Sequence, residues 1–423
     1  MKNNHLLCAL FNKRFSLLWI AEVFSQVGFN MMNFILIIVA FKISNSNTAV
    51  SGIVLSFTLP AVIFGILAGV YVDRWNKRNV LFITNIVRAM LLIILAFLHS
   101  NLFFIYLLSF AMSIVTQFFI PAETPMIPLV VKKKLLLSAN ALFGMGIYGS
   151  ILVAYALSGP FLIFFGSRNV FIVLAVLFFI AAFAISFLKA PKIKKVKEEA
   201  MSLKLDFGRE LRSSFSLIAK TKEIYHSLFL LTLSQVLILL FAVVGPGFAH
   251  QVLGINVEEF PLVLVTPAAL GMVVGAIIIA NFFHDFSREK MANIGVMLGG
   301  LSILFLPYGS KVTSREIVQT INDYLPHIFT INILHIMVFL AFVLGFANAL
   351  IFVPSNTLLQ EKTSDEIRGK IYGVLNSLVG ISSFLPVIIV GELSDIFGVG
   401  RVLTGIGISL IAFSGLRVLM ARR

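Results

Sequence analysis

Four polar side chains interrupt the first long apolar run of the sequence, and their chemistry suits the binding of a proton or a solute. They are spaced by 4, 4 and 3 residues, so a helix would place all of them on one face: Glu22, Gln26, Asn30 and Asn33. An ionisable side chain inside a membrane is costly to keep there and by default suspected of function. Glu22 is therefore the candidate for proton exchange. The amides are candidates for solute contacts or, equally, for hydrogen bonds between helices.

Weaker candidates lie in other apolar runs: Arg88, Gln117, Gln235, Asn332 and His335. Arg88 must be paired, and we expect a structural partner on the first or fourth apolar run. Asn332 and His335 would share one helix face. His335 can titrate near neutrality, although an isolated membrane histidine usually serves packing.

Composition defines the class of elements that hold these residues. Of 423 residues, 59% are hydrophobic and only 12% are charged, and the mean hydropathy is +1.00. A soluble domain does not need so much apolar residue, so the pattern predicts an all-α polytopic membrane protein. The single cysteine, Cys8, excludes an intramolecular disulfide.

Twelve apolar runs approach or exceed the length that spans a bilayer. The first has no cleavage site after it, so we expect it to be retained. The expected spans are Phe15–Phe41, Ala49–Val72, Val80–Leu98, Leu102–Ile120, Ala139–Phe165, Val170–Leu188, Ile224–Ala249, Phe260–Phe283, Met291–Tyr308, Ile328–Val353, Ile371–Leu393 and Val402–Met420.

The basic residues predict how these spans are oriented. Most of the 33 Lys and Arg fall at the termini and in every second connection, ten of them between Lys189 and Lys222. The other connections hold only Lys42, Arg168, Lys311, Arg315 and Arg401. By the positive-inside rule both termini are cytoplasmic, in the cell membrane. The net charge of +14 thus reflects the orientation of the spans in the membrane, and nucleic acid is not an expected partner.

The two sets of six spans look like copies. Phe119-Ile-Pro-Ala-Glu-Thr124 matches Phe352-Val-Pro-Ser-Asn-Thr357, and Pro60 and Pro160 have counterparts in the second half. We expect bundles at 1–188 and 223–423, joined by a basic linker at 189–222 that includes a short amphipathic helix.

A short basic loop follows the second span. It reads Gly69-Val-Tyr-Val-Asp73-Arg74-Trp-Asn-Lys77-Arg78 and resembles the signature loop of the major facilitator superfamily. Asn76 replaces a glycine of that pattern, and asparagine can also adopt a left-handed turn. The resemblance implies two pseudo-symmetric bundles with a central site lined by helices 1, 4, 7 and 10. It also implies a latch in which Asp73 meets the start of helix 11 near Gly369, while the basic residues reach Glu123.

Further motifs resemble the macrolide-efflux and enterobactin-exporter branch. They include Arg14-Phe-Ser-Leu-Leu-Trp19, Ser25-Gln-Val-Gly28, Gly159-Pro160 and the segment Leu358 to Ser377. Tyr155 stands where helix 5 of the antiporters has a glycine, and Phe29 stands where many relatives have an acid.

We therefore expect a secondary transporter, monomeric and in contact with lipid, that exports amphipathic small molecules in exchange for protons. The alternatives are a lysophospholipid or metabolite facilitator of the same fold, and a non-transporting sensor. The sequence has no G-x-x-x-x-G-K-[ST], dinucleotide fingerprint, His/Cys cluster or G-x-S-x-G. We accordingly expect no enzyme activity, no cofactor and no metal.

Overall fold

The computed structural model describes residues 5–188, 221–283, 286–312, 333–363 and 365–421. The chain forms two compact units. The N-terminal unit comprises Met1–Ile43 and Leu55–Glu210, and the C-terminal unit comprises Ser44–Val54 and Leu211–Arg423. The short segment Ser44–Val54 thus clusters with the second half of the chain, although it precedes most of the first.

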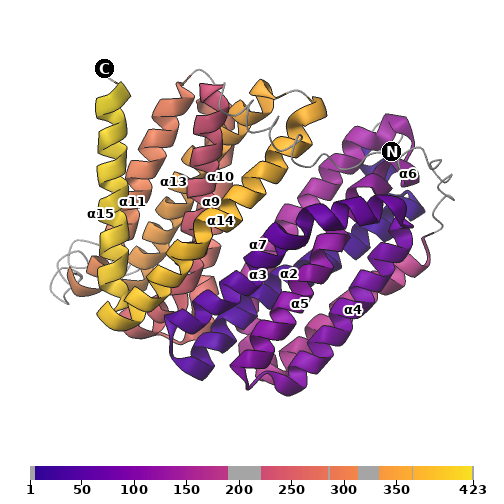
Figure 1. Ribbon diagram of the computed structural model, residues 1–423, viewed down its shortest axis with the longest axis horizontal. Coiled ribbons are helices and arrows are strands. Elements are labelled where there is room, and N and C mark those ends of the chain that lie inside the picture. Colours follow the sequence, from indigo (N-terminus) through magenta and orange to yellow (C-terminus); the bar gives the residue numbers. More distant parts are fainter. Residues whose placement is uncertain (1–4, 189–220, 284–285, 313–332, 364, 422–423) are drawn as a thin grey trace, which may run out of the picture. The chain divides into compact units, whose positions relative to one another are not determined.

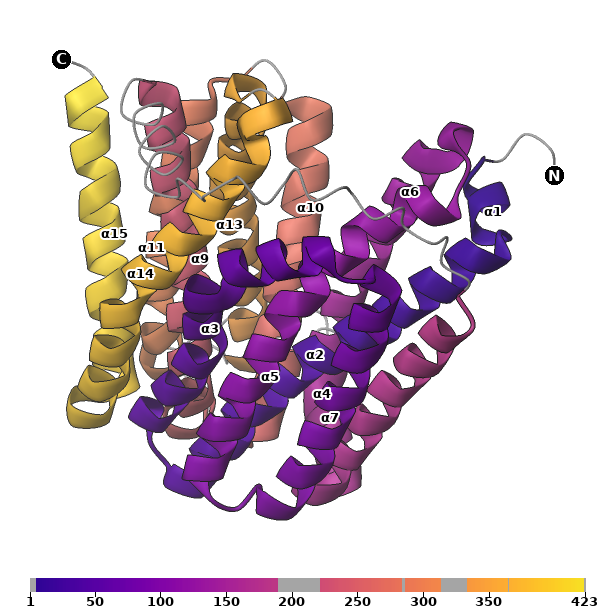
Figure 2. The same cartoon turned by 45° about the vertical axis from the view of Figure 1, so that its right-hand side comes forward.

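The N-terminal unit is built from long apolar helices that pack along their lengths. α4 lies against both α5 and α7, and the ribbons of these helices run side by side in Figures 1 and 2. An apolar core of this unit includes Phe15, Leu18 and Phe119. The helices are α1 (His5–Leu10), α2 (Lys13–Ser44), α3 (Asn47–Arg74), α4 (Lys77–Leu98), α5 (Leu102–Glu123), α6 (Ile127–Val130) and α7 (Leu136–Ser186), with 3-10 turns η1 (Thr124–Met126) and η2 (Lys133–Leu135).

α7 is long enough for two membrane spans. It has 51 residues, or about 76 Å at 1.5 Å per residue, against a hydrocarbon core of about 30 Å. Gly166 breaks it with a φ of 72°, a conformation that glycine adopts without steric cost. The expected fifth and sixth spans lie on the two sides of this kink. The described residues contain 11 helices long and apolar enough to span a membrane, so twelve spans are consistent with the structure.

The C-terminal unit is also built from helices in the part of the chain that the structure describes. α13 packs against α9, α10 and α11, and α11 packs against α15. The elements are α9 (Lys222–Gly247), the π-helix η4 (Phe248–Leu253), the 3-10 turn η5 (Val257–Glu259), the π-helix η6 (Pro261–Val265), α10 (Thr266–Phe282), α11 (Arg288–Val312), α13 (Ile333–Lys362), α14 (Asp365–Phe397) and α15 (Val399–Ala421). The expected amphipathic helix and Asn332 lie outside the described residues.

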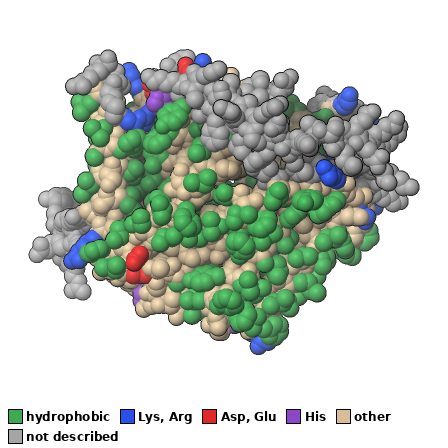
Figure 3. Space-filling model, viewed as in Figure 1, with side chains coloured by type: hydrophobic (Ala, Val, Ile, Leu, Met, Phe, Trp, Pro, Cys, Tyr) green, Lys and Arg blue, Asp and Glu red, His purple; other side chains and the backbone are tan. Residues whose placement is uncertain are grey.

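Small residues bring α10 and α13 into backbone contact. A Cβ atom at Gly345 would lie 1.7 Å from the carbonyl oxygen of Ala268, and one at Gly271 would lie 2.0 Å from that of Phe342. Such close approach between membrane helices requires residues without side chains. On the face of the molecule shown in Figure 3, the described residues present many hydrophobic side chains and few charged ones.

The link between α3 and α4 is shorter than the sequence suggests. α3 continues to Arg74 and α4 begins at Lys77, so only Trp75 and Asn76 connect them. The expected left-handed conformation of Asn76 is wrong, because its φ is −70° and its backbone is extended. Asn76 instead caps α4, and its side-chain oxygen accepts a hydrogen bond from Asn79 N at 3.4 Å.

Candidate functional site

Glu22 lies inside the N-terminal unit, on the buried face of α2. Ala21, Ser25 and Gly28 share that face, and the glycine leaves room for the Phe178 ring, which a Cβ atom would approach to 3.1 Å. Glu22 is 0% exposed, and among the described residues neither of its carboxylate oxygens has a hydrogen-bond partner. Burial of an ionised carboxylate without hydrogen bonds is unfavourable in free energy.

Arg88 of α4 is buried nearly as completely, at 1% exposed. Its guanidinium carbon lies 4.2 Å from the Phe119 ring centroid and 5.0 Å from the Phe178 ring centroid. Nε donates to the Thr84 carbonyl at 3.3 Å, whereas no described group accepts from Nη2. The two aromatic faces stabilise the cation without neutralising it.

These two ionisable groups interact electrostatically with each other. The Gln26 side chain, one turn along α2, is also close to the Glu22 carboxyl. Ser25 Oγ and Asn85 Oδ1 are buried and without partners in the described part of the chain. The site therefore combines a carboxyl group and a guanidinium cation with several unsatisfied polar atoms. Protonation of Glu22 would remove one charge of the pair and leave Arg88 free to change partner.

The remaining amides of the α2 stripe are half-buried. Asn30 Nδ2 donates to the Gln26 carbonyl at 2.8 Å and lies 3.4 Å from Gln26 Oε1. Asn33 Oδ1 is buried without a partner among the described residues. Gln117 lies on a different helix, α5, and donates to the Ser113 carbonyl at 3.2 Å. The hydrogen bond between Gln26 and Asn30 shows that these two amides share a face.

The candidates in the C-terminal unit lie apart from one another. Gln235 is half-buried on α9, and His335 is exposed in the first turn of α13. Beside Gln235, Ser234 Oγ donates to Asn348 Oδ1 at 2.9 Å, which joins α9 to α13. The sequence analysis missed Asn348, although an amide within an apolar run was a sufficient signal.

The residues of the expected latch occupy helix ends. Gly69 and Asp73 lie in the last turns of α3, and buried Glu123 ends α5. Arg78 Nε donates to the Ile185 carbonyl at 3.2 Å, and its Nη2 donates to the carbonyl of Ser186. α14 begins at Asp365, so Gly369 falls in its second turn and not at its start. The contact expected between Asp73 and α14 involves two different units and stays a prediction.

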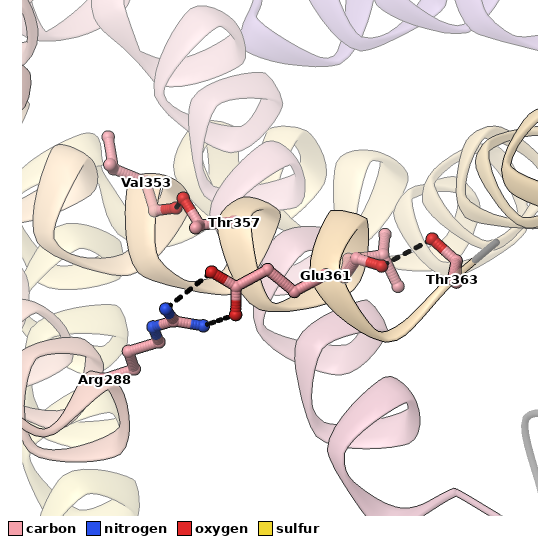
Figure 4. Close-up of polar contacts among 6 residues, drawn as sticks. Arg288, Val353, Thr357, Glu361 and Thr363 are labelled. Carbon is pink, nitrogen blue, oxygen red and sulfur yellow. Dashed lines mark hydrogen bonds and ion pairs between the residues drawn. The ribbon is translucent and has the colours of Figure 1, made fainter. Parts of the chain in front are cut away.

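A bidentate ion pair links α11 to α13 (Figure 4). Arg288 Nη2 donates to Glu361 Oε1 at 2.8 Å, and Nη1 donates to Oε2. The same close-up shows Thr357 Oγ1 donating to the Val353 carbonyl, at 2.9 Å. The pair is largely exposed, so we attribute to it a modest role in positioning the two helix ends.

These features define a polytopic helical membrane protein with a buried carboxyl group and a buried guanidinium in its N-terminal unit. The chain belongs to the major facilitator superfamily, whose family model matches residues 18–387. It is a transporter of that superfamily, which moves solutes by secondary transport.

Among sequence relatives, the chain is similar to two bacterial proteins in particular. One is the uncharacterized MFS-type transporter YvqJ of Bacillus subtilis, 22% identical over 86% of this chain and 81% of that protein. The other is macrolide efflux protein A of Streptococcus pyogenes, 20% identical over 92% of this chain and 91% of that protein.

Solved structures with the same fold include the nucleoside transporter NupG and a bacterial homologue of the lysosomal transporter Spinster. The D323A mutant of NupG aligns with a TM-score of 0.75 at 14% identity, covering 95% of this chain and 99% of that chain. The Spinster homologue aligns with a TM-score of 0.69 at 13% identity, covering 95% of each chain. At these identities the likeness shows the fold alone.

Proposed function

We propose that this protein exports amphipathic small molecules in exchange for protons, with Glu22 as the proton-binding group. The single observation that carries the proposal is the Glu22 carboxylate, which is fully buried and lacks hydrogen bonds from the described residues. An ionisable side chain in an apolar membrane helix is energetically costly, and a proton-exchange role would account for its presence.

Arg88 gives this carboxyl two distinct environments. When Glu22 is ionised, the guanidinium compensates its charge. When Glu22 is protonated, Arg88 keeps its two aromatic faces and its bond to Thr84 but loses its counter-charge. A proton can therefore shift the equilibrium between two conformations of the unit, because the two states bind it with different affinity.

The cargo class follows from the polar groups near this pair. Gln26, Asn30 and Asn33 supply amides on an otherwise apolar helix, α2. Such a surface suits bulky, mostly apolar molecules with a few hydrogen-bonding groups more than sugars or phosphates. The similarity to macrolide efflux protein A supports the same class. Both termini and the basic loop at Arg74–Arg78 would face the cytoplasm, so that export runs toward the opposite side.

The test is transport of erythromycin by purified protein in proteoliposomes with an imposed pH gradient. We expect wild-type protein to accumulate erythromycin against its gradient and Glu22→Gln to allow only equilibration, because the amide keeps the shape but cannot carry a proton. Glu392→Gln is the matched control, since it makes the same substitution at an exposed carboxylate of α14. Unchanged accumulation by Glu22→Gln would refute the assignment, and uncoupled exchange by the wild type would favour a facilitator.

A further inference from the structure

The Asn47 end of α3 is fastened to α14 by a carboxylate that the proposed proton and solute site does not use. Asp395, in the last turn of α14, accepts five hydrogen bonds from three consecutive residues. Its Oδ1 accepts from Asn47 N at 2.7 Å and from Asn47 Nδ2 at 2.9 Å. Its Oδ2 accepts from Ser46 Oγ at 2.6 Å, Thr48 N at 2.9 Å and Thr48 Oγ1 at 2.8 Å.

The position of Asp395 is favourable for α3 and unfavourable for its own helix. A negative charge is stabilised by the N-terminus of a helix and destabilised by the C-terminus. The bonds to Asn47 N and Thr48 N satisfy backbone donors that the first turn of α3 leaves open. Asp395 therefore acts as a cap supplied from another helix.

The contact continues for one further turn of α3 and two further turns of α14. Ser51 Oγ donates to the Val387 carbonyl at 2.7 Å, and a Cβ atom at Gly391 would lie 2.1 Å from Ser51 Oγ. Val387, Gly391 and Asp395 are four residues apart and so line one face of α14, as Asn47 and Ser51 line one face of α3. Asn47 is 0% exposed and Ser51 is 2% exposed.

The chain connectivity makes this contact sensitive to movement. Ser44–Val54 belongs to the C-terminal unit, but α3 continues as one helix into the N-terminal unit from Leu55. Pro60 lies inside α3 shortly after that boundary. If the two units move relative to each other, α3 must either bend in this region or leave α14.

We propose that Asp395 is a latch that holds the Asn47 end of α3 on α14 and opens during each transport cycle. It stabilises the transport state in which Ser44–Val54 stays packed within the C-terminal unit. The latch depends on transport by the family and not on the proposed cargo or proton coupling, and its test needs neither.

The first measurement is the accessibility of a cysteine beneath the contact. With Cys8→Ser and Ser51→Cys, we expect Asp395→Asn to raise the rate of labelling by a membrane-impermeant maleimide about threefold to tenfold. Thr48→Val, which removes one donor, should raise it less. Glu392→Gln, which removes an exposed carboxylate three residues earlier on α14, should leave it unchanged.

The second measurement separates a latch from local fraying. In the Asp395→Asn variant, hydrogen–deuterium exchange should rise at residues 44–54 and fall at residues 74–80. The reason is that, in alternating access, a transporter closes at one membrane face when it opens at the other. Thr48→Val should show the same pattern at smaller amplitude, so the test survives poor folding of Asp395→Asn. Exchange that rises only at 44–54, or changes nowhere, would overturn the proposal.

Discussion

Substitution of Arg88 by methionine should strongly destabilise the protein, and the cause should be Glu22. Glu22 and Arg88 interact electrostatically without a direct ion pair between them. Removal of one partner leaves the other charge buried and uncompensated, at a cost of about 3–5 kcal/mol. Arg88 also has its cation–π contacts with Phe119 and Phe178, at 4.2 Å and 5.0 Å, which methionine replaces by apolar packing. For a chain of 423 residues we therefore expect the apparent unfolding temperature to fall by about 3–6 °C.

The double substitution isolates the electrostatic part. Arg88→Met with Glu22→Gln removes both charges, and replacement of a buried pair by groups of similar volume is often neutral. We expect the double variant to unfold within about 1 kcal/mol of the wild type, with a coupling energy of about 2 kcal/mol or more.

The assay is thermal unfolding of purified protein in detergent, followed by tryptophan fluorescence. Arg168→Met is the matched control, since Arg168 also lies over a ring, that of Phe97, at 4.6 Å, but is exposed. It should cost less than about 1 kcal/mol. Equal destabilisation by Arg88→Met with and without Glu22→Gln would refute the pairing, because the loss would then come from packing alone.

Two further predictions concern the C-terminal unit. Gly345→Leu should abolish folding or lower stability by several kcal/mol, since its Cβ would meet Ala268 O at 1.7 Å, whereas Gly415→Leu, with nothing within 4 Å, should be tolerated; equal yields of folded protein would contradict the close packing. Arg288→Gln should leave the unfolding temperature nearly unchanged, and the small effect should vanish in high salt, because its pair with Glu361 is largely exposed; a large loss of stability that is independent of salt would show that the pair is not screened by solvent.

The helical fold could be predicted because each span is encoded by a continuous local segment of the sequence. Runs of apolar residues of membrane-spanning length identify helices wherever the chain places them. The kink at Gly166 could not be distinguished from a loop, because a glycine between two apolar runs is compatible with both. The conformation of Asn76 was predicted wrongly for a related reason: asparagine favours left-handed turns and helix caps alike.

The candidate site could be predicted only as separate residues. Periodicity places Glu22 and Gln26 on one helix face, but pairing with Arg88 depends on how α2 and α4 pack. The contact of Asp395 with Asn47 joins residues 348 positions apart, and a single aspartate at a helix end carries no signal for such a partner. The amide of Asn348 was missed although it was visible as a polar residue within an apolar run.

Proton release on cargo binding tests the central claim most directly. Purified protein in weakly buffered detergent solution is mixed with erythromycin, and a pH-sensitive dye reports protons released per protein. Linkage between cargo and proton binding predicts the release of up to about one proton by the wild type near neutral pH and none by Glu22→Gln, with binding retained by both. Equal proton release from the two proteins would contradict the assignment of Glu22 as the coupling group.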